Sequence, residues 1–271
     1  MPPDWTPTHS MTNEAYHLHP AVSRSALNYL LRSPKHYWEA MLNPDRVPQE
    51  STPAMLFGTA VHTAVLEPDL FATEYALAPP VTRTTKAGKE AWALAAEGGK
   101  QLLTSAEWNS IEGIKTSIQA HPAASKCLLT AGLNECTFIA KDPVTGLDLK
   151  CRPDRFTDSG WVVDLKTTQD ASTAEFAKSI HKFGYHIQAA FYLHTIEIAT
   201  GRRPLGFIFM AVEKTAPYAV QMLRLGESSM QLGNEIVQLQ LARLAYCLAA
   251  DSWPGYEDSV VDVELPAWAL K

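Results

Sequence analysis

Two aspartates and a lysine with the spacing of a chemical site lie in two neighbouring segments near the middle of the chain. Asp164 and Lys166 are two residues apart in WVVDLKTT, and Asp154 lies in the preceding segment CRPDRF. Residues two apart on a β-strand leave the same face of a sheet, so Asp164 and Lys166 are expected to point together. An antiparallel pairing across the short turn TDSG can bring Asp154 beside Asp164.

This arrangement suits a divalent cation. Two close carboxylates repel each other unless a cation lies between them, and Mg²⁺, which prefers oxygen ligands, is the usual ion in cells. A neighbouring lysine can hold or deprotonate a water molecule, or stabilise the charge that builds on a phosphate in the transition state. The alternative is a hairpin with a salt bridge between Lys166 and one aspartate, which is the commoner meaning of an isolated DxK. The adjacent Pro153-Asp154, the spacing and the strand context favour the metal site.

The segments around these residues predict the strands that would position them. ECTFIA, LDLKCRPDRF and WVVDLKTT are rich in β-branched and aromatic residues and are joined by turns that contain glycine. This pattern predicts a three-stranded meander. PLGFIFMAVEK and YAVQMLRLG predict two further strands after it.

Helices are predicted on both sides of this strand-rich part. Ser23 is expected to cap a helix in RSALNYLLRS, and AMLFGTAVHTAVLEP has the composition of a buried helix. Residues 105–130 predict a helix that is interrupted at His121-Pro122. FGYHIQAAFYLHTIEIATG predicts a long amphipathic helix ended by Gly201, and residues 227–250 predict a final helix.

These elements predict an α/β fold of the α+β type, with a central mixed β-sheet flanked by helices and a helical N-terminal region. Residues 1–20, rich in Pro, Thr and His without periodicity, are predicted to form a flexible arm. Residues 21–271 are then one domain, with a helical part over 21–130 and a sheet-containing core over 131–271.

The composition limits which binding partners and which cellular compartment are expected. The net charge is −6, from 23 basic and 29 acidic side chains, which is a mild argument against nucleic acid because phosphate contacts usually leave a basic footprint. An enzyme that binds DNA in a local channel can be acidic elsewhere on its surface, and a metal site itself requires several carboxylates. Without a leader-like or membrane-spanning stretch, and with four cysteines in neither zinc nor disulfide spacing, the sequence predicts a cytoplasmic protein without a membrane partner.

Several motifs in order along the chain resemble a nuclease family. CRPDRF followed by VVDLKTT is similar to the PD-(D/E)xK nuclease signature, and the longer resemblance is to the exonuclease VIII (RecE-type) family. It includes FGTAVHTAVLEP, the basic segment TRTTKAGKE and YHIQAAFY. The resemblance implies a PD-(D/E)xK nuclease core over most of the chain.

The resemblance also implies roles for particular residues. Asp154, Asp164 and His62, the histidine of the GxxxH motif in Gly58-Thr-Ala-Val-His62, correspond to metal-binding residues, with the backbone carbonyl of Leu165 as a further oxygen ligand. Lys166 corresponds to the catalytic lysine.

Six further residues are candidates for the site or for DNA binding. Gln188 and Tyr192, four apart on a predicted helix, match the QxxxY motif that helps to position the lysine, the water or the phosphate. Glu135 is an additional candidate acid, although an exposed edge carboxylate is the simpler reading. A DNA-contacting patch is predicted at three basic residues, whose alternative is a solvated loop: Arg83, Lys86 and Lys89.

The resulting expectation is a Mg²⁺-dependent exodeoxyribonuclease, with Mn²⁺ as a substitute ion. It would degrade linear double-stranded DNA from its ends, 5′ to 3′, and leave single strands for an annealing protein in recombination. The resemblance further implies a ring-shaped homo-oligomer that threads DNA. An endonuclease of restriction, repair or defence type on the same site is the alternative, and a non-catalytic DNA-binding protein is a third reading.

Overall fold

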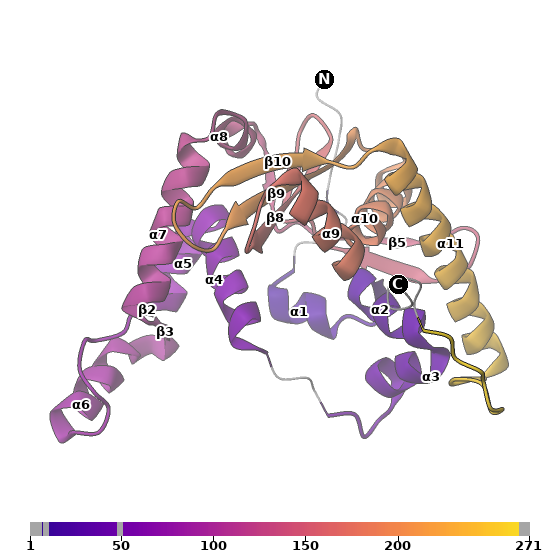
Figure 1. Ribbon diagram of the computed structural model, residues 1–271, viewed down its shortest axis with the longest axis horizontal. Helices are drawn as coiled ribbons and strands as arrows, with labels where there is room; N and C mark the ends of the chain where they lie inside the picture. The colour runs from indigo at the N-terminus through magenta and orange to yellow at the C-terminus, as the bar shows by residue number, and fades with distance from the viewer. Residues whose placement is uncertain (1–6, 8–10, 48–50, 266–271) are drawn as a thin grey trace.

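The computed structural model describes residue 7, residues 11–47 and residues 51–265, and it forms one mixed α/β unit (Figure 1). The helices of the described chain are α1 (Asn13–Leu18), α2 (Arg24–Arg32), α3 (Pro34–Tyr37), the π-helical turn η1 (Trp38–Leu42), α4 (Pro53–Leu66), α5 (Pro68–Glu74), α6 (Lys86–Ala95), the 3₁₀ turn η2 (Glu97–Gly99), α7 (Ser105–Ala120), α8 (Pro122–Leu129), α9 (Thr173–Phe183), α10 (Tyr185–Thr200) and α11 (Glu227–Ala250).

The strands form three sheets within the described residues. They are β1 (Val22–Ser23), β2 (Tyr75–Leu77), β3 (Gln101–Leu103), β4 (Gly132–Asn134), β5 (Phe138–Lys141), β6 (Asp148–Cys151), β7 (Arg155–Thr157), β8 (Trp161–Thr168), β9 (Gly206–Glu213) and β10 (Val220–Arg224). The largest sheet has the order β10-β9-β8-β7-β4, in which β8 and β9 are parallel and the other neighbours are antiparallel. Strand β8 is therefore the central strand of a mixed sheet. A smaller sheet has the order β1-β6-β5, and β2 pairs with β3.

The predicted three-stranded meander is wrong in one respect. LDLKCRPDRF was expected to be one strand, but it divides into β6 and β7, which belong to different sheets. The break falls at Pro153, which has no N–H to donate to a ladder and whose ring restricts the residue before it. Strand β5 consequently pairs with β6, whereas β7 pairs with β8.

Two hydrophobic cores cover the two faces of the large sheet. On one face, Val162 and Phe209 pack with α10 in a cluster that extends to α2 and α11. On the other face, Val163 and Leu165 pack with side chains of α4 and α7. Because successive residues of β8 alternate between these faces, Asp164 and Lys166 leave the sheet on the α10 side.

Most of the predicted helices are present, with one difference in α10. The Ser23 hydroxyl caps α2 by accepting the Ala26 N–H at 3.3 Å, and α7 and α8 meet at His121-Pro122 as predicted. Helix α10 was predicted to be amphipathic, but its buried residues are distributed around its whole circumference. The reason is its position between the sheet and α11, which the sequence periodicity does not encode.

The predicted N-terminal arm contains a packed helix. Within the described part of residues 1–20, α1 buries Tyr16, and the Lys150 ammonium donates to the Tyr16 and His19 carbonyls at 2.5 and 2.7 Å. The part of residues 11–20 around α1 thus contacts β6, and the flexibility predicted for residues 1–20 stays a prediction. The rest of that segment, apart from residue 7, lies outside the described residues.

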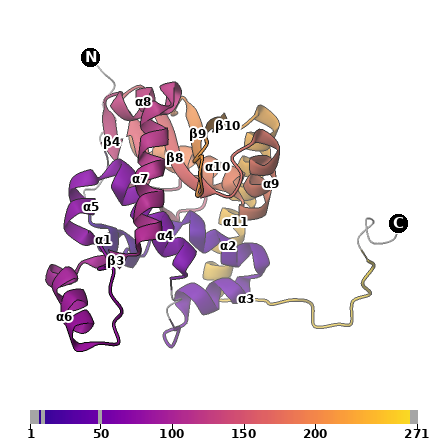
Figure 2. The ribbon, with the colours of Figure 1, turned by 60° about the vertical axis from the view of Figure 1, so that its left-hand side comes forward.

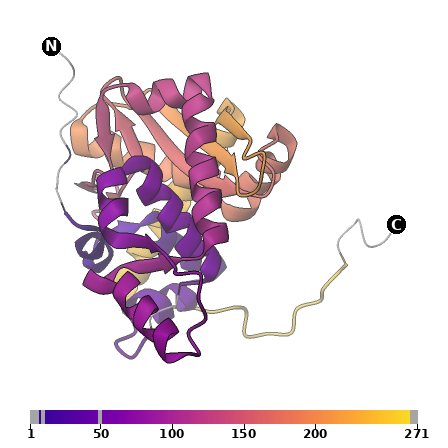
Figure 3. The same cartoon turned by 90° about the vertical axis from the view of Figure 1, so that its left-hand side faces the viewer.

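In outline, α6 with β2 and β3 projects from the body on the same side as α4 and α5, and α2 and α3 lie across from it (Figure 1). Helix α6 stays well apart from β8 when the molecule is turned (Figures 2 and 3). None of the helices in the described ranges combines the length and the apolar character needed to cross a membrane.

Candidate metal centre

The predicted residues of the centre come from five parts of the fold. His62 lies in the second half of α4, Asp154 directly precedes β7, and Asp164 with Lys166 lies in β8. Glu135 follows β4, and Gln188 and Tyr192 lie in α10. The centre therefore forms where the end of β7 meets the middle of β8, with α4 and α10 on either side.

Asp154 is held where the β7–β8 ladder stops. The last paired residues are Arg155 and Val163, so the same register places Asp154 opposite Asp164. Instead of a backbone pair, one carboxylate oxygen of Asp154, Oδ2, accepts the Leu165 N–H at 2.7 Å. This bond fixes the carboxylate at the edge of β8.

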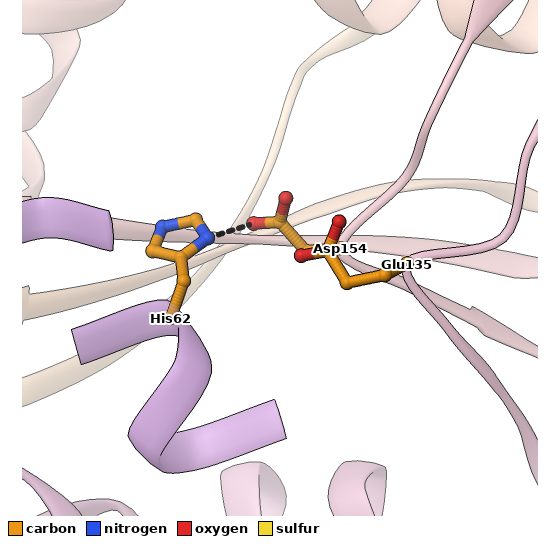
Figure 4. Close-up of side chains that lie close together, drawn as sticks. All are labelled: His62, Glu135 and Asp154. Carbon is orange, nitrogen blue, oxygen red and sulfur yellow. Dashed lines mark ion pairs between the residues drawn. The ribbon is translucent and has the colours of Figure 1, made fainter. Parts of the chain in front are cut away.

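His62, Glu135 and Asp154 converge into a ligand set. The His62 Nδ1 lies 3.3 Å from Asp154 Oδ2, and one ligand atom from each of the three residues lies within 4.8 Å of the others (Figure 4). Glu135 has a positive φ of 48°, an uncommon conformation for a residue with a side chain. The strain accompanies a carboxylate aimed into the cluster, where its Oε2 accepts from Arg152 Nε at 3.0 Å.

Asp164 and Lys166 form the adjacent half of the site. The Lys166 Nζ lies 2.5 Å from Asp164 Oδ2 and 5.0 Å from the centre of the Tyr185 ring. The Gln188 side chain donates to Asp164 Oδ1 at 2.6 Å. Asp164 Oδ2 is buried and accepts no hydrogen bond of good geometry from the described residues, so the ammonium alone balances it.

The electrostatics of the centre are unfavourable without a cation. Burial, and then the charge of Asp164, raises the pKa of Asp154 well above its usual value. Burial and then Asp154 raise the pKa of Glu135 to about 7. Burial lowers the pKa of His62, and Lys166 lowers it further. Neutral imidazole is the form that coordinates a metal, and a cation would relieve the repulsion between the acids.

Lys166 behaves in the opposite way. Burial alone would lower the pKa of its ammonium, but Asp164 and Asp154 outweigh burial and raise it. The lysine is therefore charged at neutral pH and serves as a fixed positive charge beside the acids.

A cavity of about 470 Å³ opens onto the ligand set. His62, Glu135, Asp154, Arg152 and Tyr192 form its inner wall, and residues of α1, α4 and α5 form the rest. Gly58, one turn before His62, leaves open space where a larger side chain would stand. The ligand set is consequently accessible to a substrate from the α1 and α4 side.

The structure brings most of the predicted residues together, and it separates the basic patch from them. His62, Glu135, Asp154, Asp164, Lys166, Gln188 and Tyr192 all contribute to the centre or to its cavity. The Leu165 N–H donates to Asp154, and the Leu165 backbone also forms a hydrogen bond with His62. The exposed basic residues of the predicted DNA patch lie at or near α6, and the Arg83 guanidinium stacks on the Trp92 ring at 3.7 Å.

Arg152, Tyr16 and Tyr185 contribute to the site but were absent from the sequence prediction. Arg152 was available as a signal because it stands two residues before Asp154, and its Nη1 also donates to the Met11 carbonyl at 2.9 Å. Tyr16, which lines the cavity from α1, had no such signal because the segment around it lacks periodicity.

Comparison with known proteins agrees with this geometry. The model of the PDDEXK-like domain of unknown function (DUF3799) matches residues 23–261, and the chain belongs to this family. The crystal structure of a "putative exonuclease" from Eubacterium rectale aligns with a TM-score of 0.62 and 16% identity, over 97% of this chain and 98% of that chain. At this identity the likeness establishes the fold.

Two other comparisons add little. The crystal structure of SSO0001 aligns over 89% of this chain and 95% of that chain at 14% identity, but its TM-score of 0.27 carries no argument. A search of curated proteins found no significant match. The family match and the fold therefore define a PDDEXK-like domain, in which His62, Glu135 and Asp154 form a set of ligands that can hold a metal ion.

Proposed function

We propose that this protein is a Mg²⁺-dependent exodeoxyribonuclease that degrades linear double-stranded DNA. The observation that carries the proposal is the convergence of His62, Glu135 and Asp154 beside the Asp164–Lys166 pair, within a PDDEXK-like domain. The description of the Eubacterium rectale protein as a "putative exonuclease" favours action at DNA ends. Digestion from 5′ to 3′ would leave single strands for an annealing partner.

The donor set fits a hard divalent cation. One imidazole nitrogen and two carboxylates lie within reach of one ion, and the raised pKa values of Asp154 and Glu135 reflect a negative cluster that a cation would stabilise. Oxygen-rich donors favour Mg²⁺, and Mn²⁺ can take the same ligands. Bound there, the ion would polarise the scissile phosphate and lower the pKa of water at the site.

Asp164 and Lys166 have complementary roles in this proposal. Asp164 borders the ligand set, and a contribution of its carboxylate or of the Leu165 carbonyl to the ion stays a prediction. Gln188 orients Asp164 through its 2.6 Å hydrogen bond, and Asp164 in turn keeps Lys166 charged and in place.

The Lys166 ammonium would orient the attacking water or balance the charge that develops on the phosphate. In-line attack then releases the 3′-oxygen and leaves a 5′-phosphate. Tyr192 lines the cavity in a position to contact the scissile phosphate or its sugar.

The basic residues near α6 are assigned to DNA binding remote from the bond that is cut. Arg83, Lys86 and Lys89 are exposed, and α6 is separated from β8 in all three views (Figures 1, 2 and 3). Contacts to backbone phosphates at such a distance would strengthen binding to long duplexes without sequence preference.

Digestion of end-labelled DNA tests the proposal. Linear duplex labelled at each 5′ end or each 3′ end, and closed circular duplex, are incubated with Mg²⁺ or with EDTA. We expect Mg²⁺-dependent release of the 5′ label first, with circles intact. Cutting of circles would establish the endonuclease alternative, and binding without cutting would establish the non-catalytic one.

A pair of lysine variants ties the activity to the site. Lys166→Ala is expected to be inactive, whereas Lys178→Ala removes an exposed lysine that also pairs with a carboxylate, Glu175, and should retain activity. Melting temperatures of both variants separate loss of chemistry from loss of folding. A folded Lys166→Ala protein with normal activity would contradict the assignment.

A further inference from the structure

Helix α11 has a stripe of exposed apolar side chains on its outer side. Leu232, Leu239 and Tyr246 are 48%, 65% and 71% exposed. They are seven residues apart, so they lie along one side of the helix at intervals of about two turns. The helix forms an outer edge of the molecule beside α10 (Figure 1).

The opposite side of α11 accounts for its attachment to the body. Val237, Leu241 and Leu244 are fully buried in the core shared with α10 and α2. The stripe therefore has no part in holding the helix to the described chain. Single exposed apolar residues are ordinary, but a heptad-spaced series on a 24-residue helix is typical of a helix–helix seam.

The residues around Leu239 are arranged symmetrically along the sequence. Leu232 and Tyr246 lie seven positions before and after it, and Glu235 and Arg243 lie four positions before and after it. All five belong to the exposed side of α11. Reversing the direction of the helix about Leu239 therefore exchanges apolar with apolar and acidic with basic.

The two charged residues have no oppositely charged partner among the described residues. Glu235 accepts a hydrogen bond from Gln231 of its own helix at 3.0 Å, and Arg243 Nη1 reaches the Leu30 carbonyl only at 3.5 Å. Both side chains are accordingly available to a second molecule.

We infer that α11 is a two-fold contact surface for a second copy of this chain, with the two α11 helices antiparallel and Leu239 at the axis. Leu239 would then meet Leu239 of the second copy, and Leu232 would meet Tyr246 of the second copy. Glu235 and Arg243 would stand level with each other across the contact, twice by symmetry. A parallel arrangement would instead align like charges.

The assembly formed through this contact stops at a dimer, because both molecules use the same surface. A pair of helices about 36 Å long buries an area near or below about 1,200 Å², which is at the lower end of specific interfaces, so a reversible dimer is expected. The cavity at the metal centre has no lining residue from α11, so the dimer leaves it open. A ring would need a second, different surface.

Cysteine cross-linking tests the geometry of the contact. Leu239→Cys is expected to form a dimer through its own disulfide under oxidising conditions. Leu232→Cys and Tyr246→Cys should each fail to cross-link alone and should cross-link when the two variants are mixed, because their Cβ atoms would come within disulfide range. Leu94→Cys, at a 72% exposed leucine on α6, and the unaltered chain with its native cysteines give the background.

The outcomes separate the arrangements. Self-cross-linking of Leu232→Cys and Tyr246→Cys alone would indicate parallel helices and overturn the proposal. Cross-linking of Leu239→Cys no greater than that of Leu94→Cys would show that α11 is not a contact surface. Neither result depends on nuclease activity.

Charge exchange gives an independent test by sedimentation equilibrium. Glu235→Arg and Arg243→Glu should each weaken dimerisation at least about tenfold, because two symmetric pairs become repulsive. The double variant E235R/R243E should return the dissociation constant to within about threefold of the original. A double variant as weak as the single ones, with circular dichroism unchanged, would contradict the pairing.

Discussion

Two carboxylates of this protein, the fully buried Asp142 and the partly buried Asp154, have surroundings with opposite effects on their pKa values. Asp142, fully buried, accepts hydrogen bonds from the N–H and hydroxyl of Thr145 at 2.8 and 2.6 Å and lies 2.9 Å from His194 Nε2. Burial alone would raise its pKa, but these contacts outweigh burial and lower it. Asp154 accepts one N–H and faces other acids, and its pKa is raised.

This difference indicates that Asp142 stabilises the fold, whereas Asp154 serves the function of the site. A buried acid with all its oxygens satisfied fixes a turn and one side of α10. A buried acid that repels its neighbours costs stability unless a ligand compensates, and such groups concentrate at functional sites. The substitutions below use Asp142→Asn and Asp154→Asn as a matched pair, because each removes one charge and preserves the shape of the side chain.

The largest difference is expected in DNA cleavage. Asp154→Asn should reduce Mg²⁺-dependent cleavage of linear duplex at least about a thousandfold, because it removes a metal ligand charge at the reacting centre. Asp142→Asn should cleave at close to the original rate. Initial rates with end-labelled duplex measure both, and equal losses in the two variants would show that the effect is not specific to the centre.

Metal binding should distinguish the same two variants by stability. At a Mn²⁺ or Mg²⁺ concentration about one hundred times the dissociation constant, the ion should add about 2.7 kcal/mol to the unfolding free energy of the original protein. Asp142→Asn should show the same increase, and Asp154→Asn little or none. Thermal melting with EDTA and with metal tests this, and an equal increase in Asp154→Asn would place the ion elsewhere.

In the absence of metal, stability should be lost on changing Asp142 and not on changing Asp154. Asp142→Asn is expected to lower the unfolding free energy by about 1–3 kcal/mol, since an amide cannot accept every hydrogen bond that the carboxylate accepts. Urea denaturation in EDTA gives the value. A loss below a few tenths of a kcal/mol would mean that the Thr145 and His194 contacts contribute little.

The contribution of Asp142 should also depend on pH. Its pKa is lower in the folded protein than its ordinary value, so its stabilisation is present above the unfolded pKa and is lost as pH falls through the folded one. The stability difference between the original protein and Asp142→Asn should therefore be constant above about pH 5 and decrease below about pH 4. A difference that persists unchanged at pH 3 would contradict this account.

The smallest expected effect is a gain. In EDTA, Asp154→Asn should be more stable than the original protein by about 1 kcal/mol, because it removes the repulsion between Asp154 and the acids beside it. The same urea experiment provides the number. A loss comparable to that of Asp142→Asn would mean that the two carboxylates are both structural.

Local sequence patterns were sufficient to predict most elements and to select residues that the structure brings together around Asp154 and Asp164. The spacing of Asp164 and Lys166 fixes their common face on β8, and Ser23, His121-Pro122 and Gly201 mark helix ends by their own chemistry. Strand alternation and helix capping depend on residues only a few positions apart, so both can be recognised in a single sequence.

The remainder depends on contacts between distant segments. The sheet that receives β6 after the break at Pro153 also contains β1, which is far from β6 in sequence. The attachment of α1 to Lys150 and Arg152, and the burial of α10 on all sides, depend on tertiary packing. Glu135 became a strong candidate only when its conformation and its distance to His62 and Asp154 were known.

The central claim is that one divalent cation binds between His62, Glu135 and Asp154. The most direct measurement is anomalous diffraction from crystals of the protein grown or soaked with Mn²⁺. We predict a single strong anomalous peak within coordination distance of all three residues, and its absence in Asp154→Asn crystals. A peak at another position, or none at this one under conditions that support cleavage, would contradict the claim.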